Sequence, residues 1–232
     1  MLSLIIPAYN EQSIIKKTVN YADDFLEKHC GNYEIIVVDD GSRDDTSKVL
    51  AGTNTTVVTM PRNRGKGAAV REGISKSNGD YIFFTDADLP YSLEFVVNGA
   101  KMLSKFDMVC GKRCGNYPLK RRLASAVYNK FTQSILKTDT EDVQCGIKGF
   151  TKKAAVRLLS LCRVDGFAFD TELIFLARMM GLEIGFIDVA LSHRPDSKVK
   201  ILSDGLEMLI DVIKIKNSFE AGEYNFSKSY QG

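Results

Sequence analysis

Two aspartates follow a short apolar segment at a spacing that suits cation binding. Asp86 and Asp88 come directly after residues 81–84 and are separated by one residue. Side chains two residues apart in a strand point to the same side of the backbone, so both carboxylates would leave the strand end together. Mg²⁺ is commonly held by one or two carboxylates plus the phosphates of a substrate. The pair therefore predicts a cation bound with a phosphorylated ligand, and the alternative is two ordinary loop residues where a strand stops.

Apolar segments that favour strands alternate with helical patterns along the chain. In the first half we expect strands over residues 2–7, 34–38, 55–60 and 81–84. We expect one helix over residues 11–28, a second that opens at Asp44-Asp45-Thr46, and a third that follows the loop over residues 61–69 and ends near residue 76. In the second half we expect strands over 107–111 and 183–189, with helices over 122–137, 152–161, 169–180 and 200–219. Repeated strand–helix units predict an α/β protein with a mostly parallel central sheet and helices on both faces. Pro7 is expected to end the first strand.

Polar side chains also follow the first two predicted strands. Tyr9 and Glu11 follow one, and Asp39 and Asp40 follow the other. Ligands of such sheets bind beyond the carboxyl ends of the strands. Together with the strand that ends at Asp86, these strand ends therefore predict a nucleotide site. Asp40 has a second interpretation as a helix cap.

Composition is that of an ordinary globular protein. The chain has 232 residues, 44% hydrophobic and 26% charged, with a formal net charge of +2 that argues against general nucleic-acid binding. It contains no apolar run long enough for a transmembrane helix and starts without a basic leader. An odd count of five cysteines predicts free thiols and a cytoplasmic location. We expect a catalytic domain over residues 1–199, then an amphipathic helix and tail over 200–232.

Several motifs resemble those of a known family. Four motifs occur in the order typical of family 2 glycosyltransferases. They are residues 6–11 (Ile-Pro-Ala-Tyr-Asn-Glu), 38–42 (Val-Asp-Asp-Gly-Ser), 63–67 (Asn-Arg-Gly-Lys-Gly) and 86–88 (Asp-Ala-Asp). Five further segments are similar to those of the polyprenyl-phosphate or dolichyl-phosphate glucosyl- and mannosyltransferases, namely Gly111-Lys112-Arg113 and residues 117–122, 142–146, 169–172 and 193–199. Among them, Gln144-Cys145-Gly146 is most similar to the glucosyl branch. The resemblance implies the GT-A fold, a Rossmann-like fold of nucleotide-diphospho-sugar transferases. It also implies an inverting, Mg²⁺- or Mn²⁺-dependent enzyme.

The resemblance also implies roles on the donor side. Asp88 would bind the metal, and Asp86 the metal or the ribose. The nucleotide sugar, with a UDP-sugar favoured, would be bound by Pro7, Tyr9, Glu11, Asp39, Lys66, Asp86, Arg194 and Lys198. Gly65 and Gly67 would let the backbone approach the nucleotide. Lys66 has a second reading as a solvated surface charge, and His193 is read either as a metal ligand or as a structural residue.

On the acceptor side, Arg113 and Arg121 would bind a polyprenyl phosphate, since two arginines suit a phosphate group. The basic run around Arg121 has a second reading as a solvated cluster. Asp142 and Asp170 lie where the family places acceptor-side carboxylates, and Glu172 would anchor a helix. Two departures stand out. Leu89-Pro90 follows the second aspartate where some mannosyl relatives carry a glutamine, and Lys112 replaces a serine.

These observations predict transfer of a hexose, with glucose favoured, to polyprenyl phosphate. One alternative is transfer to a glycan hydroxyl in surface-polysaccharide synthesis, with Asp142 or Asp170 as general base. Another is a catalytically silent nucleotide-binding scaffold. The helix over 200–219 is read either as packed on the catalytic domain or as lying on the membrane surface. A membrane-protein partner and a homo-oligomer stay open as further expectations.

Overall fold

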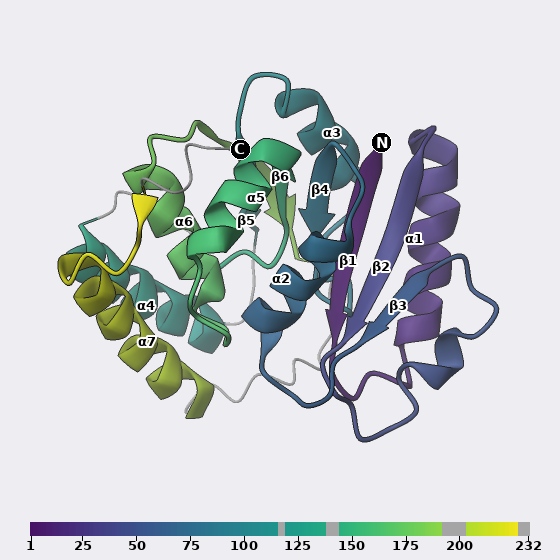
Figure 1. Cartoon of the computed structure of the whole chain (residues 1–232), viewed down its shortest axis with the longest axis horizontal. Coiled ribbons are helices and arrows are strands. Elements are labelled where there is room, and N and C mark those ends of the chain that lie inside the picture. The colour runs from purple at the N-terminus through teal and green to yellow at the C-terminus, as the bar shows by residue number, and fades with distance from the viewer. Residues whose placement is uncertain (116–118, 138–143, 192–202, 227–232) are drawn as a thin grey trace.

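The computed structural model describes the backbone of residues 1–115, 119–137, 144–191 and 203–226. Side chains at 119–121 and 203–204 lie outside the description. Figure 1 shows the arrangement of the elements.

A single mixed sheet forms the centre of the described structure. Its seven strands are β1 (Leu2–Ala8), β2 (Tyr33–Asp39), β3 (Thr56–Thr59), β4 (Tyr81–Phe84), β5 (Met108–Cys114), β6 (Lys148–Thr151) and β7 (Ile184–Ala190). They are ordered β3-β2-β1-β4-β6-β5-β7. β6 is antiparallel to both of its neighbours, whereas the other pairs are parallel. The mostly parallel sheet predicted from the strand–helix alternation is therefore confirmed.

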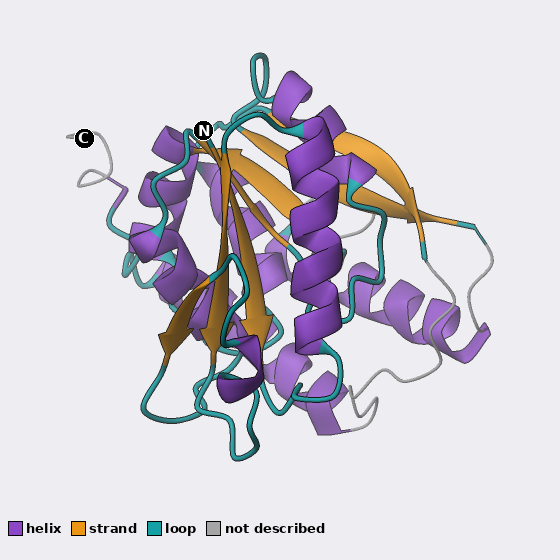
Figure 2. Cartoon of the chain, turned by 90° about the vertical axis from the view of Figure 1, so that its right-hand side faces the viewer, coloured by secondary structure: helices purple, strands orange, loops and turns teal. Residues whose placement is uncertain are grey.

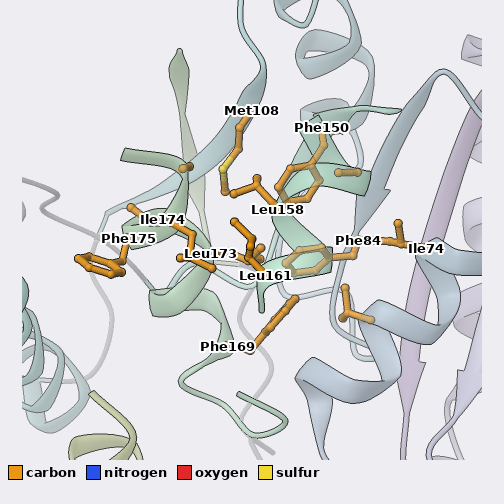
Figure 3. Packing of buried hydrophobic residues seen from close by; sticks show 14 of the residues in the cluster. Ile74, Phe84, Met108, Phe150, Leu158, Leu161, Phe169, Leu173, Ile174 and Phe175 are labelled. Atoms are coloured by element: carbon orange, nitrogen blue, oxygen red, sulfur yellow. The ribbon is translucent and has the colours of Figure 1, made fainter. Parts of the chain in front are cut away.

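Helices cover both faces of this sheet (Figures 1 and 2). One face packs on α1 (Ile15–His29) and α3 (Glu94–Met102), and the other on α2 (Lys66–Lys76), α5 (Lys152–Leu161) and α6 (Phe169–Met179). The alternation of side chains along a strand explains this division, because Leu4 and Ile6 belong to the first core and Ile5 to the second. In the second core, the rings of Phe84, Phe150 and Phe169 lie close together (Figure 3).

Two further helices pack against each other beyond α6. They are α4 (Leu119–Leu136) and α7 (Ser203–Glu220), which lie side by side at the left of Figure 1. A buried hydrogen bond from Tyr128 of α4 to Thr171 of α6, or the reverse, spans 2.8 Å. Among the residues that the structure describes, no helix has the length and apolarity needed to cross a membrane.

Three local predictions need correction. No α-helix opens at Asp44, whose carboxylate instead accepts a hydrogen bond from the Thr46 backbone N–H, and only a short 3-10 turn (Lys48–Leu50) follows. Pro7 does not end β1, because the strand runs on to Ala8. Its missing N–H costs no bond to β4, because the pairing of those strands stops at Ile5. Finally, β6 was not predicted, since four residues that include a lysine and a glycine carry a weak strand pattern.

Candidate active site

The three polar strand ends meet at one edge of the sheet. β2, β1 and β4 are neighbours and run parallel, with Ala8 paired to Asp39 and Ile5 to Phe84. The loops that follow these strands therefore leave the same edge, which is the lower one in Figure 1. The predicted convergence is confirmed.

Asp40 organises the loop that precedes α2. Its buried carboxylate accepts hydrogen bonds from the backbone N–H groups of Arg64 at 2.8 Å and Gly65 at 2.7 Å. Burial raises the pKa of Asp40, although these two N–H groups oppose the shift. Asp40 is thus a structural clamp for the loop and not the cap of a following helix.

The loops after β1 and β2 are joined to each other. The Arg43 N–H donates to the Asn10 side chain at 2.8 Å, and the Glu11 N–H donates to the Thr46 hydroxyl, also at 2.8 Å. Asp39 is buried and accepts a hydrogen bond from the Ser42 N–H at 2.9 Å. Asn10 has a positive φ of 54°, which asparagine tolerates better than most residues. The two loops therefore form one continuous wall.

The predicted donor-binding residues of β1 lie along this wall. Pro7 is half-buried at the end of the strand. Tyr9 follows it with an exposed ring, and Glu11 is half-buried. An exposed aromatic face at a strand end is available to stack against a base.

Asp86 and Asp88 lie on a tight turn after β4. The Leu89 N–H donates to the Asp86 carbonyl at 3.0 Å, and Leu89 has a positive φ of 45°. The buried Thr18 hydroxyl of α1 donates to the Ala87 carbonyl at 2.7 Å. Both carboxylates are partly exposed, as a shared ligand requires. Positive φ is unfavourable for leucine, so the surrounding structure holds the turn in place.

Gly146 abuts the Asp86 carboxylate. A Cβ atom at this position would lie 2.9 Å from Asp86 Cγ and closer still to Oδ2. Only glycine therefore leaves the Asp86 side chain where it is. Gly146 belongs to the motif Gln144-Cys145-Gly146, and this contact gives the glycine a physical role.

Lys66 bridges two carboxylates. Its Nζ lies 2.8 Å from Asp86 Oδ1 and 3.0 Å from Asp170 Oδ2. Burial alone would lower the pKa of Lys66, but Asp170 and Asp86 outweigh it and raise the pKa above its ordinary value. Lys66 is thus an ammonium within the site, and its reading as a solvated surface charge is wrong.

Asp170 is itself held between two lysines. The Lys148 Nζ, which is completely buried, lies 2.5 Å from Asp170 Oδ1 and donates to the Cys145 carbonyl at 2.6 Å. Burial would raise the pKa of Asp170, but Lys148 and Lys66 outweigh it and lower the pKa. A carboxylate whose basicity is lowered by two ammonium groups, with both oxygens already accepting hydrogen bonds, is poorly suited to act as a general base. Lys148 was not among the residues predicted for the site, although a lysine inside the apolar run 145–150 was a visible signal.

The two glycines beside Lys66 accommodate the protein's own backbone. The Gly67 N–H donates to the Asp165 carbonyl at 2.7 Å, and Gly65 has a φ of 109° beside the same carbonyl. Asp165 also forms ion pairs with Arg64 and Arg71. These glycines therefore make room for the loop over residues 164–166, which fixes the start of α2, and the approach to a nucleotide expected at them stays a prediction.

The loop over residues 162–166 is anchored in turn by Glu172. The buried Glu172 carboxylate accepts hydrogen bonds from the N–H groups of Arg163 and Val164 at 2.9 Å and from the Tyr224 hydroxyl at 2.7 Å. Glu172 is structural, as predicted, but the element that it anchors is this loop and not a helix.

Arg113 lies on β5 with a half-buried side chain, and its charge acts on the hydroxyl of the buried Tyr91. Burial and Cys145 raise the pKa of the Tyr91 hydroxyl, while the charge of Arg113 opposes the shift and that of Asp86 adds to it. The charges of Arg113 and Asp86 therefore both act on this hydroxyl. No motif in the sequence had pointed to Tyr91.

Other predicted residues lie outside the description. These are Asp142, His193, Arg194, Lys198 and the side chain of Arg121. Their roles stay predictions.

The described carboxylates fit a cation that is shared with a bound diphosphate better than a cation held by protein side chains alone. Among the described residues, no group of three or more His, Cys, Asp or Glu side chains is placed to hold a metal. Asp86 and Asp88 together offer hard oxygen ligands at a fixed turn, and Mg²⁺ or Mn²⁺ bound there would complete its shell with phosphate oxygens and water. The donor set therefore fits a divalent cation that arrives with a diphosphate.

A mostly parallel sheet with carboxylates at the ends of neighbouring strands is typical of α/β proteins that bind a ligand beyond the carboxyl ends of the strands. Comparison with known proteins identifies the family. Residues 3–159 match the model of Glycosyl transferase family 2, and the chain belongs to this family. The family recognised from the motifs is thereby confirmed.

Two curated relatives match nearly the whole chain. The dolichyl-phosphate beta-glucosyltransferase of Dictyostelium discoideum is 29% identical over 95% of this chain and 75% of its own length. The human protein of the same name is 30% identical over 98% of this chain and 78% of its own length.

A solved structure shares the fold. Glucosyl-3-phosphoglycerate synthase from Mycobacterium tuberculosis in complex with uridine-diphosphate superposes with a TM-score of 0.72 at 21% identity, over 94% of this chain and 80% of that one. The same enzyme with Mn²⁺, uridine-diphosphate and glucosyl-3-phosphoglycerate gives a TM-score of 0.69 at 18% identity. The chain therefore has the GT-A fold predicted for it.

Proposed function

We propose that this protein transfers glucose from UDP-glucose to a polyprenyl or dolichyl phosphate, with inversion at the sugar carbon and with Mg²⁺ or Mn²⁺ as cofactor. The observation that carries the proposal is the convergence of Asp86 and Lys66 at the edge where β2, β1 and β4 end, with the charge of Arg113 acting on the same Tyr91 hydroxyl as that of Asp86. The names of the curated relatives support glucose and the lipid phosphate. The ligands of the solved neighbours support UDP and the cation.

On the donor side, Asp88 and Asp86 would hold the cation, which offsets the charge that develops on the leaving diphosphate. Tyr9 would stack on the base, Asp39 would accept a hydrogen bond from it, and Pro7 and Glu11 would complete the pocket wall. Lys66 would add a positive charge near the diphosphate. Arg194 and Lys198 are proposed to close over the diphosphate.

On the acceptor side, a phosphate oxygen is already negative and does not need a strong base. It needs cations that orient it, and Arg113 and Arg121 are proposed for this task. The pairing of Asp170 with two lysines supports this route, because a glycan hydroxyl would need a base and the two lysines lower the basicity of Asp170.

The direct test is transfer from labelled UDP-glucose. We expect a lipid-linked glucose when the protein is incubated with Mn²⁺ and dolichyl or undecaprenyl phosphate in detergent, and no product when EDTA is added. GDP-mannose serves as the competing donor, and an oligosaccharide without lipid as the competing acceptor. Product on the oligosaccharide alone would favour the glycan-hydroxyl alternative. UDP binding without transfer to any acceptor would favour the silent scaffold.

A lipid acceptor requires access to a membrane, and α4 and α7 present apolar side chains that suit one. Leu123 and Val127 of α4 and Leu206, Ile210 and Ile213 of α7 are exposed. The opposite side of α7 is buried through Met208, Val212 and Ile215. The two readings of this helix are therefore compatible, since it packs on the domain with one side and keeps apolar residues free on the other. We propose that these residues attach the protein peripherally to the cytoplasmic membrane face.

Placing charge on this surface should weaken membrane binding. The double variant Leu206→Glu/Ile210→Glu replaces side chains that are 62% and 46% exposed. Burying such side chains in the interface contributes on the order of 1 kcal/mol each, so we expect at least about tenfold weaker binding to anionic liposomes. Flotation with liposomes measures this. Val156→Glu, at a 59% exposed position on α5, is the matched control and should bind like the wild type. Equal binding by the double variant would show that another surface makes the contact.

A further inference from the structure

A line of four alternating charges runs through the site. It passes from Lys148 on β6 to Asp170 on α6, then to Lys66 on α2 and to Asp86 after β4. The three contacts measure 2.5 Å, 3.0 Å and 2.8 Å in that order. Two ammonium groups and two carboxylates balance, so the line is neutral in the ligand-free protein.

Burial makes each partner in this line necessary. The side chains of Lys148, Asp170 and Lys66 are 0%, 5% and 11% exposed. A buried ammonium without an anion is strongly unfavourable. Only Asp86, at 35%, opens substantially to solvent, which is the end where a ligand can enter.

Cation binding at Asp86 disturbs this balance. A divalent ion on the Asp86 carboxylate would compete with Lys66 for the same oxygen, because Lys66 lies 2.8 Å from Oδ1 and Gly146 crowds Oδ2. Without a second anion, Lys66 would be left buried and unpaired. Asp170 is that second anion, and its other oxygen is already bound by Lys148.

We propose that Lys66 is the internal counter-ion of Asp86 in the ligand-free protein, and that Asp170, held by Lys148, is a positioning residue that keeps Lys66 in the site when the cation takes Asp86. Lys66 then faces the donor diphosphate. This inference rests on the proposed donor and cation site.

The segment over residues 145–148 supports both ends of the line. Gly146 abuts Asp86, and the Lys148 ammonium is fixed by the carbonyl of Cys145 as well as by Asp170. The Nζ atoms of Lys66 and Lys148 also lie 5.5 Å and 5.7 Å from the centre of the Phe84 ring, which is a favourable position for a cation. This one segment, which leads into β6, thus aligns the carboxylate of the cation site with the carboxylate that positions Lys66.

Two binding measurements on the ligand-free protein test the proposal. In Lys66→Met, Mn²⁺ alone should bind about tenfold more tightly, because a neighbouring opposite charge changes cation binding to a carboxylate by about that factor or more. The same variant should bind UDP, in saturating Mn²⁺, about tenfold more weakly, because it lacks a charge-assisted contact. Electron paramagnetic resonance of free Mn²⁺ and calorimetry with UDP supply the two constants. If Lys66 had a merely structural role, its replacement would weaken the binding of Mn²⁺ and the binding of UDP alike.

A second variant tests the positioning role. Lys148→Met/Asp170→Leu removes both partners of the buried pair, a change that is often neutral for stability. We expect a thermal midpoint close to that of the wild type, no tightening of Mn²⁺ binding, and UDP binding about tenfold weaker because Lys66 has lost its second anion. Lys153→Met, an exposed position on α5, is the control and should match the wild type in both constants.

Unchanged or weaker Mn²⁺ binding by Lys66→Met would overturn the counter-ion role. UDP binding at the wild-type level by the double variant would overturn the positioning role. Should the double variant not fold, Asp170→Asn, which keeps the size of the side chain and removes the second anion of Lys66, supplies the UDP measurement in its place. Because no arm measures transfer, a wild type that binds UDP and Mn²⁺ but forms no lipid-linked glucose would contradict the proposed acceptor and leave this inference standing.

Discussion

Replacing Asp88 with asparagine is expected to reduce cation-dependent transfer by about a thousandfold or more. A bound metal contributes several kcal/mol to stabilising charge in the transition state, and about 1.4 kcal/mol corresponds to tenfold in rate. Asparagine keeps the size of the side chain but loses the negative charge that a hard cation needs. Binding of UDP should be partly retained, because the pocket wall formed by Tyr9 and Asp39 is unchanged. Initial rates with UDP-glucose, measured over a range of Mn²⁺ concentrations, give the change in kcat and in the cation requirement.

Asp24→Asn is the matched control for this variant. Asp24 is an exposed residue of α1, and its substitution should leave the rate and the Mn²⁺ dependence as in the wild type. Full activity of Asp88→Asn at the wild-type Mn²⁺ concentration would place the cation elsewhere. Loss of both activity and the thermal transition would mean that the turn after β4 depends on Asp88 for folding, and circular dichroism separates the two cases.

The strand ends could be predicted because they depend on short-range patterns. Apolar segments followed by polar residues identify Asp39 and Asp86, and the direction of parallel strands then places both at one edge. No long-range information is needed for that step. The short strand β6 was missed, because its pairing with β4 and β5 is decided by segments far away in the sequence.

Individual roles within the site depended on tertiary contacts that no pattern shows. Lys66 could be read as a surface charge until Asp170, more than a hundred residues later, was placed beside it. Asp40 could be read as a cap until its carboxylate was seen to hold the N–H groups of Arg64 and Gly65. A buried charge is defined by its partner, and here each partner comes from a different element of the fold.

Replacing Gly146 with alanine is expected to lower kcat/KM by about a hundredfold. The added Cβ would lie 2.9 Å from Asp86 Cγ and closer to Oδ2, so the carboxylate must move. Displacement of a reacting or ligating group by roughly 1 Å costs about that factor in rate. The same movement would pull Asp86 from Lys66, which lies only 2.8 Å away. Steady-state kinetics with UDP-glucose measures the loss, and calorimetry shows whether UDP binding with Mn²⁺ falls along with it.

Gly31→Ala is the matched control, because a Cβ there would have nothing within 4 Å. It should keep the wild-type rate. Overpacking at Gly146 also costs stability, by about 1–3 kcal/mol, so unfolding in denaturant must be followed in parallel. A protein that is folded under the assay conditions yet slow would locate the defect at Asp86. If Gly146→Ala were folded and fully active, the contact with Asp86 would not constrain the reacting geometry, and the support that residues 145–148 give the cation site would have to come from Lys148 alone.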